Sequence, residues 1–397
     1  MITVKDIDKI VEDNREEAIS FLQECIMTPS VTGEELAMGE VIKNWILKSG
    51  FEPEWYEKEK NRPNVVTRWK GSKPGKQFIF NGHMDVFPPV AGNPGLYGPW
   101  SGKIVDGYIY GRGSVDMKSG LCAALMAMKY LKQLGFDPEG SILFTAVSDE
   151  ENSGEAGTKF LISEGIIQGD FGVCMEPTRE RVLVEHCGGF SAKITYTSPS
   201  GHTSIPHPSI DAMTKSIHAI NKLYELNEEI MQNYREDMGT WSLLSVTMIN
   251  SGNAANMYPS ESTFVIDRRL LPGENLETEH KRVLAALDSL KEDHPDKDYS
   301  YSYEVLGEYP CLVVDDSEEI VKLAFAAYRD VTGNTTTLYR RGGGSDASDV
   351  ADKLGIPMPN FGPGNDYEEG TSENEHISLD DYIKFIKVYM QMVVKAL

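Results

Sequence analysis

The 397-residue chain has little positive charge for its size. It contains 38 lysines and arginines against 61 aspartates and glutamates, which gives a formal net charge of −23. Nucleic acids and anionic membranes are bound through patches of lysine and arginine, so this balance argues against both as partners. We expect most of the acidic residues to keep the protein soluble, with a few of them available as ligands.

Cysteine and long apolar runs are also scarce. No run of about 18 apolar residues occurs, so no membrane span is expected. The first residues, Met-Ile-Thr-Val-Lys-Asp, do not include the apolar core of a secretory signal. The five cysteines are scattered without a Cys-x-x-Cys pair, which favours reduced and mostly buried thiols in a cytoplasmic protein.

Length and periodicity predict a two-domain α/β protein. A chain of 397 residues is too long for one ordinary core. Helical and strand patterns alternate up to about residue 181 and resume after residue 305, which indicates a largely parallel sheet covered on both faces by helices. The clearest helix is expected at Met117–Leu134, and a helix start with a capping box is expected at Thr32 and Glu35.

The segment between these two parts has a different pattern. Residues 182–305 combine alternating, half-exposed strands with two amphipathic helices, at Ile210–Leu226 and Thr278–Leu290. This pattern predicts a compact α+β insertion with strands on one face and helices on the other. The outer domain is therefore expected to comprise residues 1–181 and 306–397, and the inserted domain residues 182–305.

Three short apolar runs, which are typical of buried strands, are each followed by residues that can hold a metal. These residues are His83 and Asp85 after the first run, Glu150 and Glu151 after the second, and Glu176 after the third. In open α/β sheets, ligands bind just beyond the carboxyl ends of the strands. The three strand ends are therefore expected to converge, and a metal site is the leading interpretation.

His83 and Asp85 lie two residues apart and so point to the same side of an extended backbone. His83 could ligate a metal while Asp85 accepts a hydrogen bond from the other imidazole nitrogen. The alternative is a lone histidine at the start of a loop, satisfied by the backbone.

Three further acids have a possible chemical use. Asp116 follows a glycine-rich loop that lacks both the Walker and the dinucleotide-binding patterns, so it is either a helix cap or a bridge between two cations about 3.5–4 Å apart. Of the adjacent Glu150 and Glu151, one could ligate a cation and the other could act on a water molecule. The alternative for this pair is a solvated acidic loop.

These motifs occur together in one order: His83-x-Asp85, Gly111-x-Gly113-x-x-Asp116-x-Lys118-x-Gly120, Glu150-Glu151-x-x-Gly154 and Glu176-Pro177. As an ordered set, they resemble the M20 metallopeptidase family, which includes acetylornithine deacetylase, succinyl-diaminopimelate desuccinylase, aminoacylase and carboxypeptidase G2. The resemblance covers nearly the whole chain. It implies a zinc-peptidase-like sheet sandwiched by helices, with an inserted ferredoxin-like lid or dimerisation domain.

The resemblance also implies roles for the clustered residues. His83 and Glu176 would hold one metal, Asp116 would bridge, and Glu151 would ligate a second metal. Glu150 would be the general base and Asp85 would orient His83. The cofactor would be one or two Zn²⁺ ions, with Co²⁺ or Mn²⁺ as substitutes.

Further matches fall in the inserted segment and just after it. The resemblance implies that His202 reaches across a homodimer to stabilise the oxyanion in the partner's site, and that Asn256 and Arg269 bind the carboxylate of the substrate. Gly343 belongs to a glycine-rich substrate loop. Without the family match, His202 would be interpreted as a surface turn histidine and Arg269 as half of an ion pair at the rim.

One position departs from the family pattern. The family ends in His-x-x-Asn-Glu, whose histidine ligates the second metal, and Thr371 stands in its place here. Threonine is a poor zinc ligand, so the second site is weak or empty, or another group fills it. The residues close enough in sequence are His376, Glu368, Glu369 and Glu373.

The activity expected from this resemblance is metal-dependent hydrolysis of an amide bond. The substrate would be a small N-acyl amino acid or dipeptide with a free carboxylate, and Glu150 would act as general base. Two alternatives remain open, namely an N-carbamoyl amidohydrolase and, because of Thr371, a non-hydrolytic homologue that binds a metal or a ligand.

Overall fold

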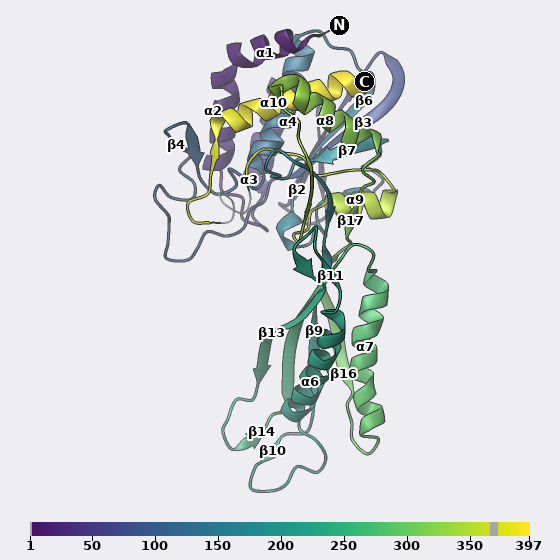
Figure 1. The fold of residues 1–397 in the computed structure, drawn as a ribbon. Coiled ribbons are helices and arrows are strands. Elements are labelled where there is room, and N and C mark those ends of the chain that lie inside the picture. The colour runs from purple at the N-terminus through teal and green to yellow at the C-terminus, as the bar shows by residue number, and fades with distance from the viewer. Residues whose placement is uncertain (1, 366–371) are drawn as a thin grey trace. The chain divides into compact units, whose positions relative to one another are not determined.

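The computed structural model describes residues 2–365 and 372–397 and divides into two compact units (Figure 1). The first unit comprises Met1–Glu185, Leu312–Tyr339 and Ser345–Leu397. The second comprises His186–Cys311 and Arg340–Gly344. The second unit therefore interrupts the first in sequence.

The first unit is built on a five-stranded sheet. Its order is β1-β2-β6-β3-β7, with β1 at Pro53–Glu57, β2 at Pro63–Lys70, β6 at Glu139–Val147, β3 at Lys73–His83 and β7 at Phe171–Cys174. Strands β6, β3 and β7 run parallel, while β1 and β2 form an antiparallel edge. The last six residues of β3 are all buried, as expected for a strand covered on both faces. The predicted α/β fold with a mostly parallel sheet is thus confirmed.

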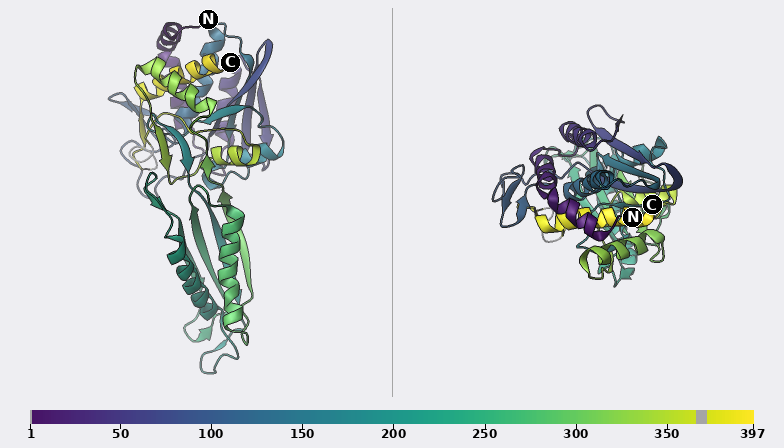
Figure 2. Two further views of the ribbon diagram at one scale, coloured as in Figure 1. Left: turned by 45° about the vertical axis from the view of Figure 1, so that its right-hand side comes forward. Right: turned by 90° about the horizontal axis from the view of Figure 1, so that it is seen from above.

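Helices pack against this sheet and against one another. They are α1 (Val4–Asp13), α2 (Arg15–Met27), α3 (Leu36–Lys48), α4 (Lys118–Gln133), α5 (Thr158–Ser163), α8 (Glu319–Thr332), α9 (Ala347–Leu354) and α10 (Leu379–Ala396), with a short 3₁₀ turn at Glu150–Asn152. The two views of Figure 2 place α8 beside α10. Helix α4 is buried along nearly its whole length and contacts β3 and β6. A Cβ atom on Gly120 would lie 2.0 Å from the carbonyl oxygen of Met175, so only glycine allows this close approach.

Two small sheets complete the first part of the structure. One has the order β19-β5-β4, with β19 at His376–Ser378, β5 at Tyr108–Tyr110 and β4 at Lys103–Val105. The other has the order β17-β8-β18, with β17 at Leu312–Val313, β8 at Val182–His186 and β18 at Leu338–Arg341. Among the described residues, no helix combines the length and the apolar character needed to cross a bilayer.

The second unit has one antiparallel sheet and two helices. The sheet order is β13-β15-β9-β16, with β13 at Leu243–Ser251, β15 at Glu261–Leu270, β9 at Gly188–Thr197 and β16 at Tyr301–Tyr309. The helices are α6 (Ala212–Ile230) and α7 (Leu276–Asp293). Two short ribbons are added, β10 (Gly201–His202) with β14 (Met257–Tyr258) and β11 (Tyr234–Arg235) with β12 (Thr240–Trp241).

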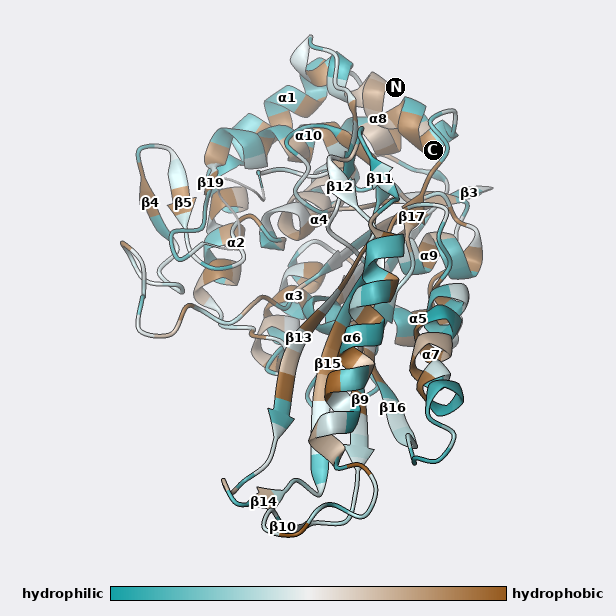
Figure 3. Cartoon of the chain, turned by 60° about the horizontal axis from the view of Figure 1, so that its bottom comes forward, coloured by the Kyte–Doolittle hydropathy of each residue, from teal (hydrophilic) through white to brown (hydrophobic). Residues whose placement is uncertain are grey.

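This order of elements is the ferredoxin-like arrangement expected from the sequence. Along β15, buried and half-exposed residues alternate, because one face of the sheet is covered by the helices. Figure 3 shows apolar residues along β13 and β15 and polar residues along much of α6. The core of the unit joins Phe264 and Ile266 of the sheet to Leu223 of α6 and Leu287 of α7.

Candidate metal centre

Adjacent strands of the first unit deliver the candidate ligands to one edge of the sheet. His83 is the last residue of β3, and Glu150 and Glu151 follow β6 after a two-residue gap. Glu176 lies two residues beyond the end of β7. Because β6, β3 and β7 are neighbours and parallel, their carboxyl ends meet at the same edge.

The imidazole of His83 lies at the centre of the cluster. Its Nε2 is 3.2 Å from Oδ1 of Asp116, 3.5 Å from Oε1 of Glu176 and 3.8 Å from Oε2 of Glu150. Ligand atoms lie within 4.8 Å of one another in two overlapping groups, one of His83, Glu150 and Glu176 and one of His83, Asp116 and Glu151. The structure therefore brings the predicted general base, Glu150, together with the four predicted metal ligands, which are His83, Asp116, Glu151 and Glu176.

The orientation of His83 is set by a route that differs from the expected one. Its Nδ1 is 2.9 Å from the backbone carbonyl oxygen of Asp85, whereas the nearest carboxylate oxygen of Asp85 is 3.7 Å away. The carbonyl accepts the hydrogen bond from Nδ1–H, which leaves the lone pair of Nε2 directed at the carboxylates. The backbone, rather than the carboxylate, thus holds the ring.

The carboxylate of Asp85 instead holds the turn that carries the glutamates. It is fully buried, and it accepts hydrogen bonds from the backbone N–H of Glu150 at 3.2 Å and of Glu151 at 3.3 Å. The hydroxyl of Thr32 donates to it at 2.9 Å. The capping box expected at Thr32 and Glu35 is wrong, because α3 begins at Leu36 without a side-chain cap and both residues bond elsewhere.

A buried ion-pair network supports the same turn. Asp149 adopts a left-handed backbone with φ of 72°, which is uncommon outside glycine. Its carboxylate accepts hydrogen bonds from Nη2 of Arg62 at 2.6 Å and from the N–H of Ala156 at 2.9 Å. Arg62 also donates to the buried Glu35 at 2.8 Å. The sequence analysis did not predict this network, and it assigned Glu35 to a capping box, because ion pairs between distant segments have no local pattern.

The electrostatics of the cluster fit a bound cation. Burial alone lowers the pKa of His83, but the nearby carboxylates of Glu150, Asp116 and Glu176 outweigh it and raise that pKa well above its ordinary value. Burial raises the pKa of Glu150 and of Glu151 well above the ordinary value, and neighbouring carboxylates add to the effect. A divalent cation would relieve this crowding of negative charge, so the donor set fits a metal.

Asp346 is a further buried acid close to this cluster. It directly precedes α9 as the N-cap residue, and the hydroxyl of Thr158 donates to its Oδ2 at 2.7 Å. Burial raises the pKa of Asp346 to about 7, with the charge of Asp349 adding to the effect. The sequence analysis gave Asp346 no role.

The second unit pairs two of the other predicted site residues. His202 lies on β10, and its Nε2 is 3.2 Å from Nδ2 of Asn256. Its Nδ1 contacts the hydroxyl of Ser204 at 2.8 Å. Both His202 and Asn256 are exposed, so their polar atoms are open to a ligand.

Arg269 and the glycine-rich loop form a separate group in the second unit. Arg269 donates to Oδ1 of Asp267 at 2.8 Å and to the hydroxyl of Tyr309. A Cβ on Gly344 would lie 2.4 Å from Cε2 of Tyr309, so the loop that contains Gly343 packs against this tyrosine. Tyr309 was not identified from the sequence.

The two groups of the second unit lie at opposite ends of one strand. Glu261 of β15 pairs with Thr197 beside the His202 ribbon, while Arg269 pairs with Gly189 at the other end. Eight residues of an antiparallel strand span about 27 Å. Within one copy of the unit, Asn256 and Arg269 therefore do not meet, although the sequence analysis assigned both to one carboxylate.

Two of the four candidates to replace the family's last histidine, His376 and Glu373, lie within the described residues. Thr371, Glu368 and Glu369 lie outside the described residues. His376 is on β19, with its ring stacked on Tyr110 and its Nδ1 2.8 Å from the carbonyl oxygen of Asn374. Among residues 2–365 and 372–397, neither His376 nor Glu373 belongs to a group that could hold a metal.

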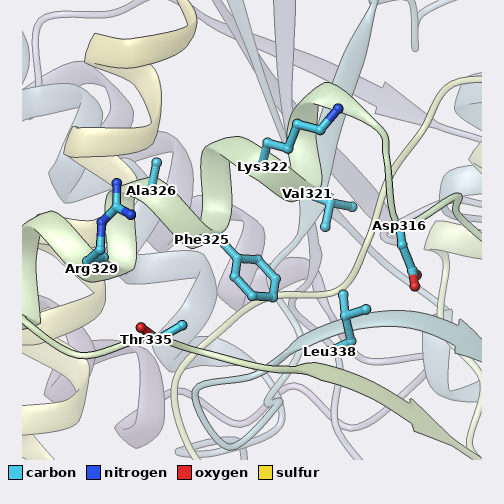
Figure 4. A pocket seen from close by; sticks show the side chains of 8 residues that line it. All are labelled: Asp316, Val321, Lys322, Phe325, Ala326, Arg329, Thr335 and Leu338. Carbon is cyan, nitrogen blue, oxygen red and sulfur yellow. The ribbon is translucent and has the colours of Figure 1, made fainter.

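A separate cavity of 340 Å³ opens beside α8 (Figure 4). Val321 and Phe325 of the helix and Leu338 of β18 form its apolar wall, and Lys322 and Arg329 add positive charge. It contains none of the candidate metal ligands, so it is distinct from the metal centre.

Comparisons with known proteins agree with this geometry. The model of the family described as Peptidase family M20/M25/M40 matches residues 79–395. The succinyl-diaminopimelate desuccinylase of Paracoccus denitrificans (strain Pd 1222) is 30% identical over 348 residues, which is 85% of this chain and 87% of that protein. A solved M20 family metallo-carboxypeptidase from Sulfolobus solfataricus is similar with a TM-score of 0.76 at 18% identity, over 95% of this chain and 98% of that chain. A dinuclear metal-binding M20 peptidase of Bacillus subtilis is similar with a TM-score of 0.66 at 14% identity, over 97% and 98%.

Proposed function

The chain belongs to peptidase family M20/M25/M40 and is a metal-dependent hydrolase of amide bonds, and we propose that it acts on a small substrate with a free carboxylate. The substrate class would be N-acyl amino acids, with dipeptides as the other form. The observation that carries this proposal is the convergence of His83, Asp116, Glu150, Glu151 and Glu176 at one edge of the sheet. The likeness to a desuccinylase over most of both chains favours the N-acyl form.

The donor set supports an assignment of the metal ligands. His83 and Glu176 would hold one ion, Glu151 a second, and Asp116 would bridge them. Nitrogen and carboxylate donors suit Zn²⁺, with Co²⁺ or Mn²⁺ as substitutes. When bound, such ions polarise a carbonyl group and lower the pKa of water toward about 7.

We propose that Glu150 is the general base. Its side chain is 14% exposed, so it is held by the turn yet reachable by water and substrate. It would take a proton from the attacking water and return it to the leaving amine. General acid–base catalysis of this kind contributes roughly 10²–10⁴-fold to the rate.

Arg269 would recognise the substrate carboxylate. Its side chain is 44% exposed, and Asp267 and Tyr309 fix the guanidinium from one side. A guanidinium binds a carboxylate through two parallel charge-assisted hydrogen bonds. Gly343 lies in the loop that packs beside Tyr309 and would contribute backbone groups to the same substrate.

We also propose a homodimer formed through the second unit. His202 and Asn256 lie beyond the start of β15, whose residues from Glu261 to Arg269 span about 27 Å, so they would act on the substrate bound by another copy. His202 of the partner subunit would then stabilise the oxyanion, an interaction typically worth about 3–4 kcal/mol. Strand β13 is an edge strand that exposes Met248 and Ile249, as an interface between copies requires (Figure 3).

The proposed function is tested by separating metal binding from turnover. Glu150→Ala should keep its metal content by elemental analysis and lose nearly all hydrolysis of N-succinyl amino acids, N-acetyl amino acids and dipeptides. Asp116→Ala should lose metal. Turnover retained by Glu150→Ala would refute its role as base, and full metal content in Asp116→Ala would refute the bridging role.

Two other functions remain to be tested, the second of them because of Thr371. An N-carbamoyl amidohydrolase would release ammonia from N-carbamoyl amino acids, which a coupled ammonia assay detects. A non-hydrolytic homologue would bind metal and ligand without turning over any member of the substrate panel in the presence of Zn²⁺, Co²⁺ or Mn²⁺.

A further inference from the structure

One buried carboxylate beside the metal centre has no part in the proposed reaction. Glu375 lies just before β19 and is 2% exposed. Its Oε2 accepts hydrogen bonds from Nη1 of Arg112 at 2.7 Å and from the N–H of Gly113 at 3.0 Å. Its Oε1 accepts from the N–H of Val115 at 2.8 Å and of Asp116 at 3.1 Å. All four donors belong to the segment 112–116.

The segment 112–116 curls around this carboxylate. Gly113 has a φ of 85°, and a Cβ there would lie 2.8 Å from Cγ1 of Val86, so the position requires glycine. The carbonyl oxygen of Glu375 also accepts a hydrogen bond from the N–H of Gly111 at 2.9 Å. Successive N–H groups turned toward one anion form a concave site that fixes the backbone.

The last of these donors belongs to a candidate ligand. The N–H of Asp116 points to Glu375, while Oδ1 of the same residue is 3.2 Å from Nε2 of His83. The position of the Asp116 carboxylate therefore depends on a backbone that Glu375 holds. Asp116 alone thus links the carboxylate of Glu375, through its backbone N–H, to His83, through its side chain.

A buried ion pair that only stabilises the fold has different partners. Glu279 of the second unit is 4% exposed and accepts hydrogen bonds from the guanidinium groups of Arg268 and Arg282. Glu375 bonds one guanidinium, but its three other donors are backbone N–H groups of the loop that presents Asp116. This difference makes Glu279 a matched control for Glu375.

We propose that Glu375 is a positioning residue of the metal centre, which clamps the backbone of residues 113–116 so that Asp116 faces His83. The inference rests on the proposed function, because Asp116 is there assigned as a bridging ligand. Outer partners that orient metal ligands typically contribute 10–100-fold to metal affinity. Glutamine at position 375 would offer one accepting oxygen in place of two and would turn an NH₂ group toward two N–H donors.

The experiment compares Glu375→Gln, Glu279→Gln and Asp116→Asn with the wild type. Metal-free proteins are titrated with Co²⁺ against a chromophoric chelator, the Co²⁺ absorption spectrum is recorded, and deuterium uptake of peptides covering residues 111–117 is followed by mass spectrometry. Glu375→Gln should bind Co²⁺ about 10–100-fold more weakly, with an altered spectrum and faster uptake in residues 111–117. Glu279→Gln should match the wild type in all three measurements.

The outcomes separate this inference from the proposed function. If Asp116→Asn weakens Co²⁺ binding but Glu375→Gln does not, the clamp is refuted and the ligand assignment stands. If Asp116→Asn binds Co²⁺ like the wild type, the ligand assignment fails, and unchanged uptake in Glu375→Gln would then refute the clamp as well. If Glu375→Gln does not fold, wild-type uptake decides, because rapid exchange of residues 113–116 in the folded protein would overturn the proposal.

Discussion

Replacing Asp149 by alanine is expected to destabilise the first unit by about 3.5–5.5 kcal/mol without removing any proposed ligand. The buried N–H of Ala156 would lose its acceptor, which costs roughly 1–3 kcal/mol. Arg62 would lose one of its carboxylates but keep Glu35, so this loss should lie near the lower end of the roughly 1.5–3 kcal/mol typical of hydrogen bonds to charged groups. Alanine at a φ of 72° adds about 1 kcal/mol.

Asparagine at the same position isolates the charge. Its side chain still accepts from the N–H of Ala156, and asparagine tolerates the left-handed backbone. Only the charge opposite Arg62 is removed, so Asp149→Asn should cost about 1–2 kcal/mol. Comparing the loss of unfolding free energy in Asp149→Ala with that in Asp149→Asn therefore separates the contribution of the charge from that of the hydrogen bond and the backbone.

Urea unfolding of the metal-free protein, followed by tryptophan fluorescence, measures these costs. Four of the five tryptophans (Trp45, Trp55, Trp69 and Trp100) belong to the first unit, so the signal reports mainly on that unit. Asp106 is the matched control, since it is exposed and also left-handed, with a φ of 50°. Asp106→Ala should cost about 1 kcal/mol, the backbone contribution alone. The reasoning is refuted if Asp149→Ala costs no more than Asp106→Ala.

Three further outcomes are expected. Gly120→Ala should destabilise the protein and weaken metal binding in a Co²⁺ titration, because the added methyl group would displace Met175, the neighbour of Glu176; wild-type metal affinity would contradict this. Chelation of the metal should lower the midpoint of thermal unfolding, since an ion present at 1,000 times its Kd stabilises the folded state by about 4 kcal/mol; an unchanged midpoint would show that the cluster holds no ion. Burial raises the pKa of Asp381 from 3.8 to about 6 despite the nearby Lys384. Between these two pH values the folded chain holds a proton that the unfolded chain has lost, so wild-type stability should fall by about 2 kcal/mol relative to Asp381→Asn as the pH rises from about 4 to 6; an equal difference in stability between the two proteins at both pH values, measured by urea unfolding, would contradict the assignment.

The features predicted from sequence are those with a local pattern. The helix expected at Met117–Leu134 is α4 at Lys118–Gln133, because its apolar positions repeat at the helical period and Gly135 follows it with a φ of 75°. The convergence of His83, Glu150 and Glu176 followed from apolar strands that end beside one another in a parallel sheet.

The features missed are contacts between distant segments. The capping box at Thr32 and Glu35 was a reasonable local pattern, but tertiary bonds to Asp85 and Arg62 prevailed over it. The route by which Asp85 acts was wrong for the same reason, since residue spacing does not distinguish a carbonyl oxygen from a carboxylate oxygen. Asn256 and Arg269 were predicted to bind one carboxylate, but Asn256 precedes the start of β15 and Arg269 lies near the end of that strand.

The metal centre depends on acids that are not ligands. Asp85 holds the N–H groups of Glu150 and Glu151, Asp149 holds the N–H of Ala156 in the segment that follows them, and Glu375 holds the N–H of Asp116. Acids suit this task because a carboxylate accepts several hydrogen bonds and a backbone N–H can only donate. As a consequence, these supporting carboxylates lie behind the candidate ligands in a buried region, where negative charges repel one another strongly. The same arrangement that aims the ligands therefore increases the attraction for a divalent cation, so metal binding and the stability of these loops should rise and fall together.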